Sequence, residues 1–430
     1  MTPRKSSRTS TRKSTSKTTR TSATTRTRPS TAKSISKRTS RSASTTKTTS
    51  TKKAARTRAT SRRAAVSAAG SVQEQLEAIE RSGGTGDVTL GRGVQLHVSS
   101  LDKVYFPEAG VTKGALMRYY ARVAPLLLPH LDGRPLVLKR YPEGVAGEMF
   151  FQQDAGPHVP AVVRVQALDT EEKGKRMRII GGDLVTLLYT VQLGAIEVHP
   201  WLSRVSDIDS ADRCLIDLDP GDDVEFPVVV GLARDILRIV EECGLSAAVK
   251  TSGSTGMHVV LPLPPRTSYD TSVRLATLIA GVAVRLRPEL ATVERSIHGR
   301  PAGSIYVDAM QNARGKSAAS AYSVRARAGA TVSAPVEPEE LTARLRMGAF
   351  TTRTMPARIA QEGDIWGRAL ATRPTTRALV RAMQVLEEAL DAPARDAGEP
   401  RAQKRRSAGG RDAGAGAARR RRGRADAAEK

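Results

Sequence analysis

The stretch RCLIDLDPGDD, residues 213–223, places two carboxylates two residues apart at the end of an apolar run. The run predicts a buried strand over 214–219, and side chains at positions i and i+2 of a strand point to the same face. Asp217 and Asp219 would therefore lie side by side and repel each other unless a cation neutralised them. Carboxylate oxygens suit Mg²⁺ or Mn²⁺, so one interpretation is a metal site. The alternatives are a solvated strand end and a phosphatase that uses Asp217 as its nucleophile.

The sequence around this stretch predicts a mixed α/β fold. Residues 184–201 read as a helix that breaks at Gly194 and resumes as a strand, and residues 246–263 read as two strands joined by a Gly-rich turn. Apolar spacing predicts further helices over 113–128, 227–244 and 271–290, and further strands over 134–142 and 304–310.

The excess positive charge is confined to the two ends of the chain. The net charge is +26, yet residues 1–70 hold 20 Lys and Arg without an Asp or Glu, and residues 393–430 hold 12 basic and 5 acidic residues. Residues 71–392 keep 37 basic and 38 acidic residues. Ends so poor in apolar residues are typical of disordered tails, and their cations would bind DNA or RNA without sequence preference. A solubilising tail, an overlong start and a transit peptide are the alternatives.

These patterns suggest a domain organisation. We expect disordered basic tails over 1–70 and 393–430, a linker over 71–94, a catalytic domain over 95–370 and a C-terminal helix over 371–392. No apolar run approaches the roughly 18 residues of a membrane span, and no signal peptide is evident, which predicts a soluble intracellular protein. Two cysteines are too few for a disulfide scaffold or a cysteine-rich zinc site.

A second motif, KTSGSTGMHVV (250–260), combines closely spaced glycines with hydroxyl side chains. Glycines let backbone N–H groups turn toward an anion, and Ser252, Ser254 and Thr255 add hydroxyl donors. His258 opens the following strand. The motif would suit a triphosphate; the alternative is an ordinary Gly-Ser turn with a packed histidine.

Taken together, the motifs resemble the polymerase domain of the bacterial non-homologous end-joining ligase D, in the archaeo-eukaryotic primase superfamily. The similarity covers residues 95–370 and implies a primase-polymerase fold with a central, mainly antiparallel RRM-like sheet, flanking helices and an N-terminal α/β lobe. The blocks that carry it include DLDPG (217–221), SGSTGMH (252–258), YVDAMQN (306–312), FFQQ (150–153) and EVHPW (197–201).

The resemblance also implies roles for single residues. Asp217, Asp219 and Asp308 would bind two Mn²⁺ or Mg²⁺ ions. Phe150 and Phe151 would stack on a base or the template, although a core plug is the alternative. Lys103 and Lys113 would grip the 5′-phosphate of a DNA break, although lone lysines are more often solvated. The incoming nucleoside triphosphate would be held by Lys139, His199, Ser252, Thr255, His258, Gln311, Arg325 and Arg327.

Two features depart from the family pattern. Many relatives carry a lysine at the position of Thr255, so Arg327 or Lys316 would have to replace its charge. The spacing from His199 to Asp217 is shorter than in some relatives. No ligase nucleotidyl-lysine block is evident in the sequence, so ligation would come from a partner.

The function implied is template-directed transfer of a nucleotide, preferably a ribonucleotide, onto a primer 3′-hydroxyl. The enzyme would fill gaps at 5′-phosphorylated DNA ends beside Ku and a separate ligase, in the bacterial cytoplasm close to the nucleoid. A histone-like protein that coats DNA is the non-enzymatic alternative.

Overall fold

The computed structural model describes residues 70–170 and 174–393. These residues belong to one compact unit of the chain. Apart from Gly70 and Pro393, the predicted basic tails lie outside the described residues. Within the described ranges, no helix combines the length and the apolar character that crossing a membrane requires.

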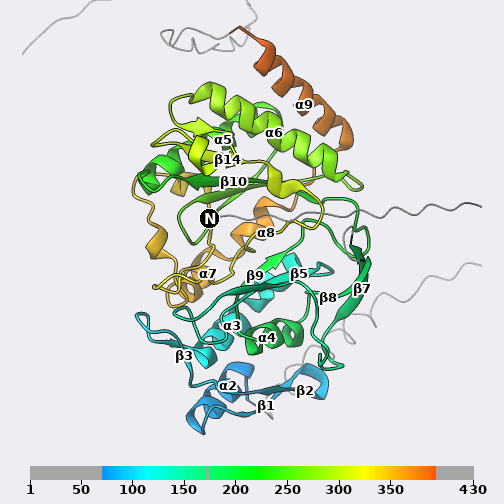
Figure 1. The fold of residues 1–430 in the computed structure, drawn as a ribbon, viewed down its shortest axis with the longest axis vertical. Helices are drawn as coiled ribbons and strands as arrows, with labels where there is room; N and C mark the ends of the chain where they lie inside the picture. Colours follow the sequence, from blue (N-terminus) through cyan, green and yellow to red (C-terminus); the bar gives the residue numbers. More distant parts are fainter. Residues whose placement is uncertain (1–69, 171–173, 394–430) are drawn as a thin grey trace, which may run out of the picture. The chain divides into compact units, whose positions relative to one another are not determined.

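A six-stranded sheet forms the centre of the fold (Figure 1). Every neighbouring pair is antiparallel except β13 and β14, which run parallel. The result confirms the predicted central, mainly antiparallel sheet. In spatial order its strands are β13 (Ala291–Thr292), β14 (Ile305–Asp308), β10 (Arg213–Pro220), β12 (Met257–Pro262), β11 (Ala248–Thr251) and β15 (Pro335–Val336).

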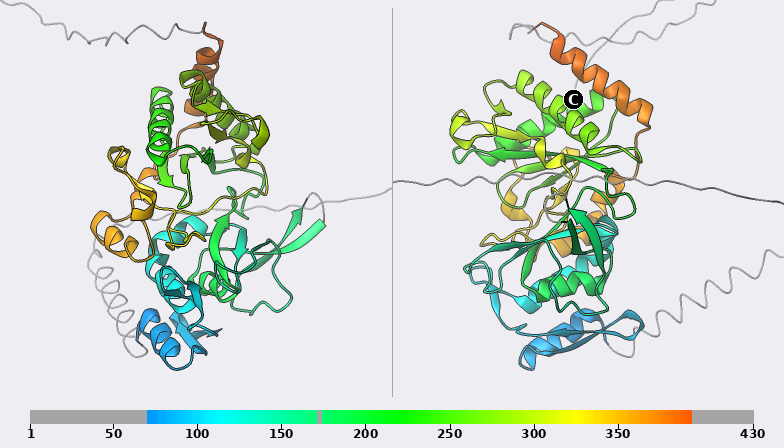
Figure 2. Two further views of the ribbon diagram at one scale, coloured as in Figure 1. Left: turned by 60° about the vertical axis from the view of Figure 1, so that its left-hand side comes forward. Right: turned by 45° about the vertical axis from the view of Figure 1, so that its right-hand side comes forward.

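Two long helices, α5 (Phe226–Glu242) and α6 (Tyr269–Leu286), cover one face of this sheet, and α9 (Thr376–Asp391) packs on the outside of α6 (Figure 2). Each helix starts where its sequence favours a start. Pro227 stands in the first turn of α5, and the hydroxyl of Ser268 accepts the N–H of Thr271 to cap α6.

A smaller α/β lobe is built on a second antiparallel sheet. Its strands are β6 (Phe150–Gln152), β5 (Leu136–Arg140) and β9 (Ala195–Pro200), with α4 (Leu184–Gln192) leading into β9. The two-stranded pairs are β3 (Val104–Phe106) with β4 (Val111–Thr112), and β7 (Val165–Thr170) with β8 (Gly174–Ile179).

Helix α3 (Lys113–Leu131) extends past the predicted end at residue 128. Thr112 caps its first turn by accepting the N–H of Ala115 at 3.0 Å. Pro125 and Pro129 both lie inside the helix, four residues apart, so the backbone hydrogen bonds that they remove lie toward its C-terminal end.

The prediction of a linker over residues 71–94 is wrong. That segment begins with α2 (Val72–Arg81) and continues into the antiparallel pair β1 (Gly86–Leu90) and β2 (Val94–Val98). Ser71 and Glu74 form a capping box at the start of α2, which packs against α3. The buried side chains of Leu76 and Val88 join the hydrophobic core, so the segment is structural rather than a spacer.

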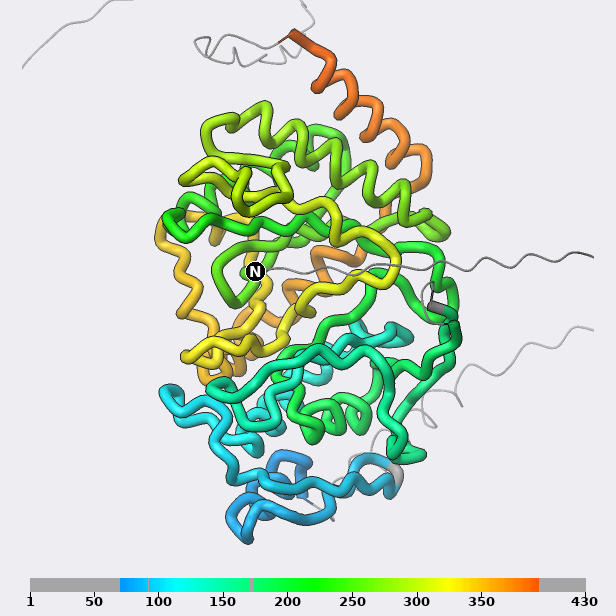
Figure 3. The backbone as a smooth tube through the Cα atoms, in the orientation of Figure 1, coloured from blue at the N-terminus to red at the C-terminus, as the bar shows by residue number. Residues whose placement is uncertain are grey.

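After β14 the backbone, yellow to orange in Figure 3, turns back toward α3. The hydroxyl of Tyr119 on α3 donates to the carbonyl of Tyr322 at 2.9 Å. The last part of this return holds α7 (Met355–Glu362) and α8 (Ile365–Ala369).

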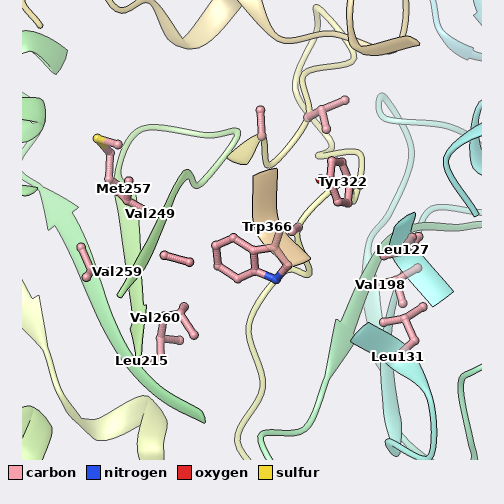
Figure 4. Close-up of a cluster of buried hydrophobic side chains, with 14 of the residues drawn as sticks. Leu127, Leu131, Val198, Leu215, Val249, Met257, Val259, Val260, Tyr322 and Trp366 are labelled. Atoms are coloured by element: carbon pink, nitrogen blue, oxygen red, sulfur yellow. The ribbon is translucent and has the colours of Figure 1, made fainter. Parts of the chain in front are cut away.

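Trp366 on α8 fills the space between the central sheet and the smaller lobe (Figure 4). Its indole lies with Leu215 and Val260 of the sheet on one side and Leu127 and Leu131 of α3 on the other. All five side chains belong to a single hydrophobic core. The described residues of both lobes are therefore packed together through this seam.

Candidate active site

Two neighbouring aspartates of β10, Asp217 and Asp219, meet Asp308 of β14, which is about 90 residues farther along the chain. Asp217 pairs directly with Asp308 across the antiparallel ladder, and Asp219 pairs with Tyr306. Directly opposed residues of such a pair share a face, as do residues two apart on one strand. The structure therefore brings all three predicted carboxylates to the same face of the central sheet.

Burial and mutual repulsion raise the pKa of two of these carboxyl groups. Burial and the charge of Asp219 raise the pKa of Asp217 to about 8. Burial and the charge of Asp308 raise the pKa of Asp219. A bound cation would relieve exactly this repulsion, since it favours the ionised form of each carboxyl group.

Asp308 is held by its own neighbours. One oxygen accepts the backbone N–H of Met310 (2.7 Å) and the hydroxyl of Tyr306 (3.2 Å), and the other accepts the amide of Gln311 (3.0 Å). Across the described part of the chain, no three His, Cys, Asp or Glu side chains stand in a ready-made metal geometry. The donor chemistry nevertheless fits a hard divalent cation, provided that Asp308 exchanges one of its present partners for it.

A row of polar side chains continues from Asp217 into the sheet. His258 lies opposite Asp217, with Nε2 3.2 Å from Oδ1, and Lys250 lies opposite His258, with Nζ 2.8 Å from Nδ1. Lys250 also donates to the hydroxyl of Ser333 at 2.6 Å, because that hydroxyl gives its own proton to the carbonyl of Thr251. Donation from Lys250 to Nδ1 leaves the proton of His258 on Nε2, facing Asp217.

Burial disfavours the charged forms of both His258 and Lys250. Burial and the charge of Lys250 lower the pKa of His258, so its ring is neutral at physiological pH. Burial and Arg325 lower the pKa of Lys250. From the sequence, no role was predicted for Lys250 beyond its place at the start of the Gly-rich motif 250–260. A lysine within a short apolar strand, AAVKT (247–251), was the available signal.

The Gly-rich turn between β11 and β12 is folded around Ser252. The hydroxyl of Ser252 accepts the N–H of Ser254 (3.1 Å) and of Gly256 (3.0 Å). These two N–H groups therefore point to Ser252, so the N–H groups of this turn that could face an anion are others. Gly256 lies so close to β10 that a Cβ would come within 1.8 Å of the carbonyl oxygen of Leu218, which explains the glycine.

Arg327 reaches this turn from the other side. Its Nε donates to the hydroxyl of Ser254 at 2.8 Å. It therefore stands one residue from Thr255, where many family members were expected to carry a lysine. Lys316 is exposed.

Glu197 organises three of the predicted nucleotide-binding side chains. Its carboxylate, only 1% exposed, lies 3.2 Å from Lys139 Nζ, 2.9 Å from His199 Nε2 and 2.9 Å from Arg325 Nε. Burial alone would raise the pKa of Glu197, but the hydrogen bond from His199 and the charge of Arg325 hold it well below its usual value. Sequence reasoning missed Glu197, although an acid inside the apolar strand AIEVH (195–199) was a signal.

A pocket of about 170 Å³ gathers most of the predicted site. His199 is among its lining residues, despite the short spacing to Asp217. Lys139, Arg327 and Asp308 lie beside the pocket through the contacts described above. The predicted residues that line it are His199, Asp217, Asp219, Ser252, Thr255, His258, Gln311 and Arg325.

Phe150 and Phe151 are both on the surface, so the alternative of a core plug is wrong. Their exposed fractions are 44% and 57%. They are neighbours on edge strand β6 and point to opposite faces. Phe150 stacks with Arg140, whose guanidinium lies 4.9 Å from the ring centroid, and Phe151 pairs with Lys139 across the β5–β6 ladder.

Lys103 and Lys113 are close to each other, since the N–H of Lys113 bonds to the carbonyl of Lys103 at 2.8 Å. Lys103 pairs with Glu143 (2.5 Å). Lys113 is buried, not solvated, and donates to the carbonyl of Ser99 at 2.9 Å. Burial and the charge of Lys103 lower the pKa of Lys113 to about 8.

Comparison with known proteins identifies relatives of this arrangement. A family model described as LigD, primase-polymerase domain, matches residues 112–366. The multifunctional non-homologous end joining protein LigD of Pseudomonas aeruginosa is 33% identical over 289 residues, which is 66% of this chain and 34% of that protein. The bifunctional non-homologous end joining protein LigD of Bacillus subtilis is 32% identical over 270 residues, 63% of this chain and 43% of that protein. The chain thus spans well under half the length of these curated relatives.

A solved structure shares the fold. The polymerase domain from Mycobacterium tuberculosis Ligase D, in complex with DNA, superimposes with a TM-score of 0.60 at 31% sequence identity. The match covers 65% of this chain and 99% of that domain.

Proposed function

The chain belongs to the LigD primase-polymerase family, and from this membership we propose that it transfers nucleotides onto primer 3′-hydroxyl groups at DNA ends in non-homologous end joining. The family is one of metal-dependent nucleotidyltransferases. The observation that carries the proposal is the position of the aspartate row, Asp217 opposite Asp308, directly beside the pocket lined by Arg325.

The three aspartates would hold two divalent ions, Mn²⁺ or Mg²⁺. When bound, such ions supply charge neutralisation at the transferring phosphoryl group and its pyrophosphate leaving group. Asp308 also accepts the proton of the primer hydroxyl, or orients that hydroxyl for attack. Its hydrogen bonds from Met310 and Gln311 fix the direction of its carboxylate.

The remaining pocket residues position the triphosphate. Arg325 offers a planar fork for phosphate oxygens, and Glu197 fixes its orientation from behind. His258 presents Nε2–H toward the Asp217 side of the pocket. Catalysis is then chiefly positioning and electrostatics. The other nucleotide contacts are Lys139, His199, Ser252, Thr255, Gln311 and Arg327.

The DNA contacts lie on the smaller lobe. The exposed faces of Phe150 and Phe151 stack on bases without regard to sequence, and Lys103 with Lys113 receives the 5′-phosphate of a gapped end. The relative from M. tuberculosis was solved with DNA, which supports a DNA substrate.

The cellular setting follows from the relatives, whose names place them in non-homologous end joining. We propose that Ku and a separate DNA ligase act beside this chain, that ribonucleotides are preferred, and that the protein works in the bacterial cytoplasm near the nucleoid. The 20 cations of residues 1–70 would keep it close to DNA.

The alternative functions explain fewer observations. A phosphatase with Asp217 as nucleophile gives no reason for Asp308 beside it or for the cluster around Glu197. A histone-like protein gives no reason for a buried polar pocket in a near-neutral core.

The test is primer extension on gapped, 5′-phosphorylated DNA, with ribonucleoside and deoxyribonucleoside triphosphates compared in Mg²⁺ and in Mn²⁺. Wild-type protein should extend the primer, and the double variant Asp217→Ala, Asp219→Ala should not, while its circular dichroism stays native. Extension by the folded double variant would refute the assignment.

A further inference from the structure

A second polar pocket, of about 200 Å³, lies at the other end of strand β10. It opens between the end of α3, the start of β10 and the segment that follows α8. Arg213, at the first position of β10, lines this pocket, while Asp219 near the last position lines the active-site pocket. Six residues of strand place the two sites roughly 20 Å apart. Leu215 lies on β10 between Arg213 and Asp217, on the side of the sheet that faces the indole of Trp366 (Figure 4).

The lining of this pocket carries more positive than negative charge. It contains three arginines, Arg204, Arg213 and Arg373, and a single carboxylate, Asp212. A fourth arginine, Arg134, lies behind the wall with a fully buried side chain and takes both oxygens of Asp212 at 2.6 Å. Arg204 and Arg373 also contact this carboxylate, with Nε and Nη2 lying 3.2 Å and 3.5 Å from Asp212 Oδ2. One negative charge is therefore shared among three guanidinium groups.

Among the described residues, Arg213 forms no ion pair with a carboxylate, although the charge of nearby Asp212 favours its ionised form. Its Nη2 lies 3.0 Å from Nδ1 of His130, an uncharged partner. Burial and the charge of Arg134 lower the pKa of Arg213 to about 9, and burial lowers that of His130 to about 3. Arg213 is partly buried, and the carboxylate nearest to it in sequence, Asp212, is already held by both of its oxygens to Arg134. Charges that are withdrawn from water in proteins are normally paired.

One further acid lies nearby, but it does not face the pocket. Asp132 is exposed and contacts Arg204 at 3.7 Å and Arg164 at 3.2 Å. It is not part of the pocket lining. The arginines that line the cavity therefore outnumber the carboxylates of the described residues that could neutralise them, and the pocket attracts an anion.

We propose that this pocket binds a phosphoryl oxyanion between the guanidinium groups of Arg204, Arg213 and Arg373. Arginine forks match the oxygens of a phosphate group and keep their charge, and each such charge-assisted hydrogen bond is stronger than a neutral one. Free phosphate and the phosphodiester of a nucleic acid share this chemistry. The cavity volume accommodates either a free ion or one backbone phosphate.

The experiment is isothermal titration calorimetry of the full chain with inorganic phosphate, at constant ionic strength and with a chelator in place of metal. Wild-type protein should bind with a stoichiometric site that Arg213→Gln and Arg373→Gln each weaken about tenfold or more. Arg373 is 43% exposed in its side chain, so its variant folds even if Arg213→Gln does not.

Two control variants test whether phosphate binds in this pocket and not elsewhere on the protein. Arg381→Gln removes the same charge from the exposed surface of α9 and should leave phosphate binding unchanged. Arg325→Gln removes the arginine of the active-site pocket and should also leave this binding site intact. Equal affinities for wild type, Arg213→Gln and Arg373→Gln would overturn the proposal. So would loss of the site in Arg325→Gln alone. Neither outcome depends on polymerase activity.

A competition arm identifies the source of the anion. A twelve-nucleotide single-stranded DNA without terminal phosphates is added to the phosphate-saturated protein. Displacement of phosphate that disappears in Arg373→Gln assigns the pocket to a nucleic-acid backbone. Retention of phosphate assigns it to the free ion.

Discussion

Asp217 and Asp308 face each other across the β10–β14 ladder, and Asp219 stands two residues farther along the same strand. The electrostatic cost of this arrangement appears in the pKa of Asp217, which burial and Asp219 raise to about 8. A carboxyl group whose pKa is higher in the folded than in the unfolded chain stabilises the fold at low pH. The contribution is complete below the ordinary value of 3.8 and is lost as the pH rises through about 8.

We therefore predict that the metal-free protein becomes less stable between pH 5 and pH 8.5 and that Asp217→Asn removes most of this dependence. The free energy of unfolding, measured with urea at each pH in the presence of a chelator, gives the comparison. Above pH 8 the variant should exceed wild type by about 1–2 kcal/mol. Asp222→Asn, an exposed acid on the following turn, is the matched control. A variant with the same pH slope as wild type would contradict the repulsion.

Glu197→Gln should weaken nucleotide binding. The amide keeps the shape of the side chain but removes the charge that orients Arg325 and Lys139. KM for the incoming triphosphate should rise about tenfold or more, with a loss of about 1–3 kcal/mol in stability. Steady-state extension kinetics and urea unfolding measure the two effects. Glu387→Gln breaks an exposed pair with Arg274 and should change neither. An unchanged KM in Glu197→Gln would show that Arg325 is oriented by other groups.

Lys250→Met should slow the chemical step more than it weakens DNA binding. Without Lys250, the contact of Nε2 with Asp217 is left to hold the proton of His258 on Nε2, and Nδ1 loses the donor that excludes the other tautomer. Removal of such a supporting residue typically lowers activity by about 10–100-fold. Single-turnover extension gives the rate, and fluorescence anisotropy gives the DNA affinity.

The variant Ser333→Ala separates the two partners of Lys250. It deletes the hydroxyl 2.6 Å from Lys250 but leaves the contact with His258. Its rate should fall less than about tenfold. Equal losses in Lys250→Met and Ser333→Ala would mean that the lysine acts only by packing.

Recognition of a 5′-phosphate should weaken as the pH rises above 8. Burial and Lys103 lower the pKa of Lys113 to about 8, so its ammonium charge is present below that pH and is lost above it. The ratio of dissociation constants for unphosphorylated and 5′-phosphorylated gapped DNA should shrink between pH 7 and pH 9. Lys113→Arg keeps its charge throughout and should show a flat ratio. A wild-type ratio that stays constant to pH 9.5 would exclude Lys113 from the phosphate contact.

Phe150→Ala and Phe151→Ala should each weaken binding to the template without lowering the melting temperature. Their side chains are 44% and 57% exposed, so they contribute little to the core, whereas base stacking contributes about 1–3 kcal/mol per ring. Anisotropy with single-stranded and gapped DNA measures the affinity. Val380→Ala, on an equally exposed position of α9, is the control. Lower melting temperatures with unchanged affinity would show that the rings are structural.

Much of the fold could be predicted from local patterns. The apolar run 214–219 became β10, and the helix that breaks at Gly194 before a strand became α4 and β9. In the segment 71–94, the capping box of Ser71 and Glu74 was a readable signal for α2. The strands β1 and β2 were harder to predict, because they are only five residues each and are buried by packing against α2 and α4. Pro129 suggested a helix end. The helix continues to Leu131 because packing of its last turn stabilises it by more than the loss of one backbone hydrogen bond costs.

For the site, the sequence predicted the residues expected to touch substrate better than the residues that support them. The family resemblance supplied residues that touch substrates, and the structure brings most of them around one pocket. It did not supply Glu197 or Lys250, which act on other side chains and whose importance lies in partners far away in sequence, such as Arg325 and Ser333. A charged residue in a short apolar strand is a signal for such a role, but its partner is set by tertiary structure alone.

The place of Trp366 also constrains how the protein is made. Its indole packs between the two lobes (Figure 4). Trp366 is nevertheless synthesised after every described strand of both lobes. During translation the lobes can form in turn, but their joint interior stays open to water until almost the last helix is synthesised. The interface between the two lobes is therefore completed only near the end of synthesis, when α8 becomes available to pack.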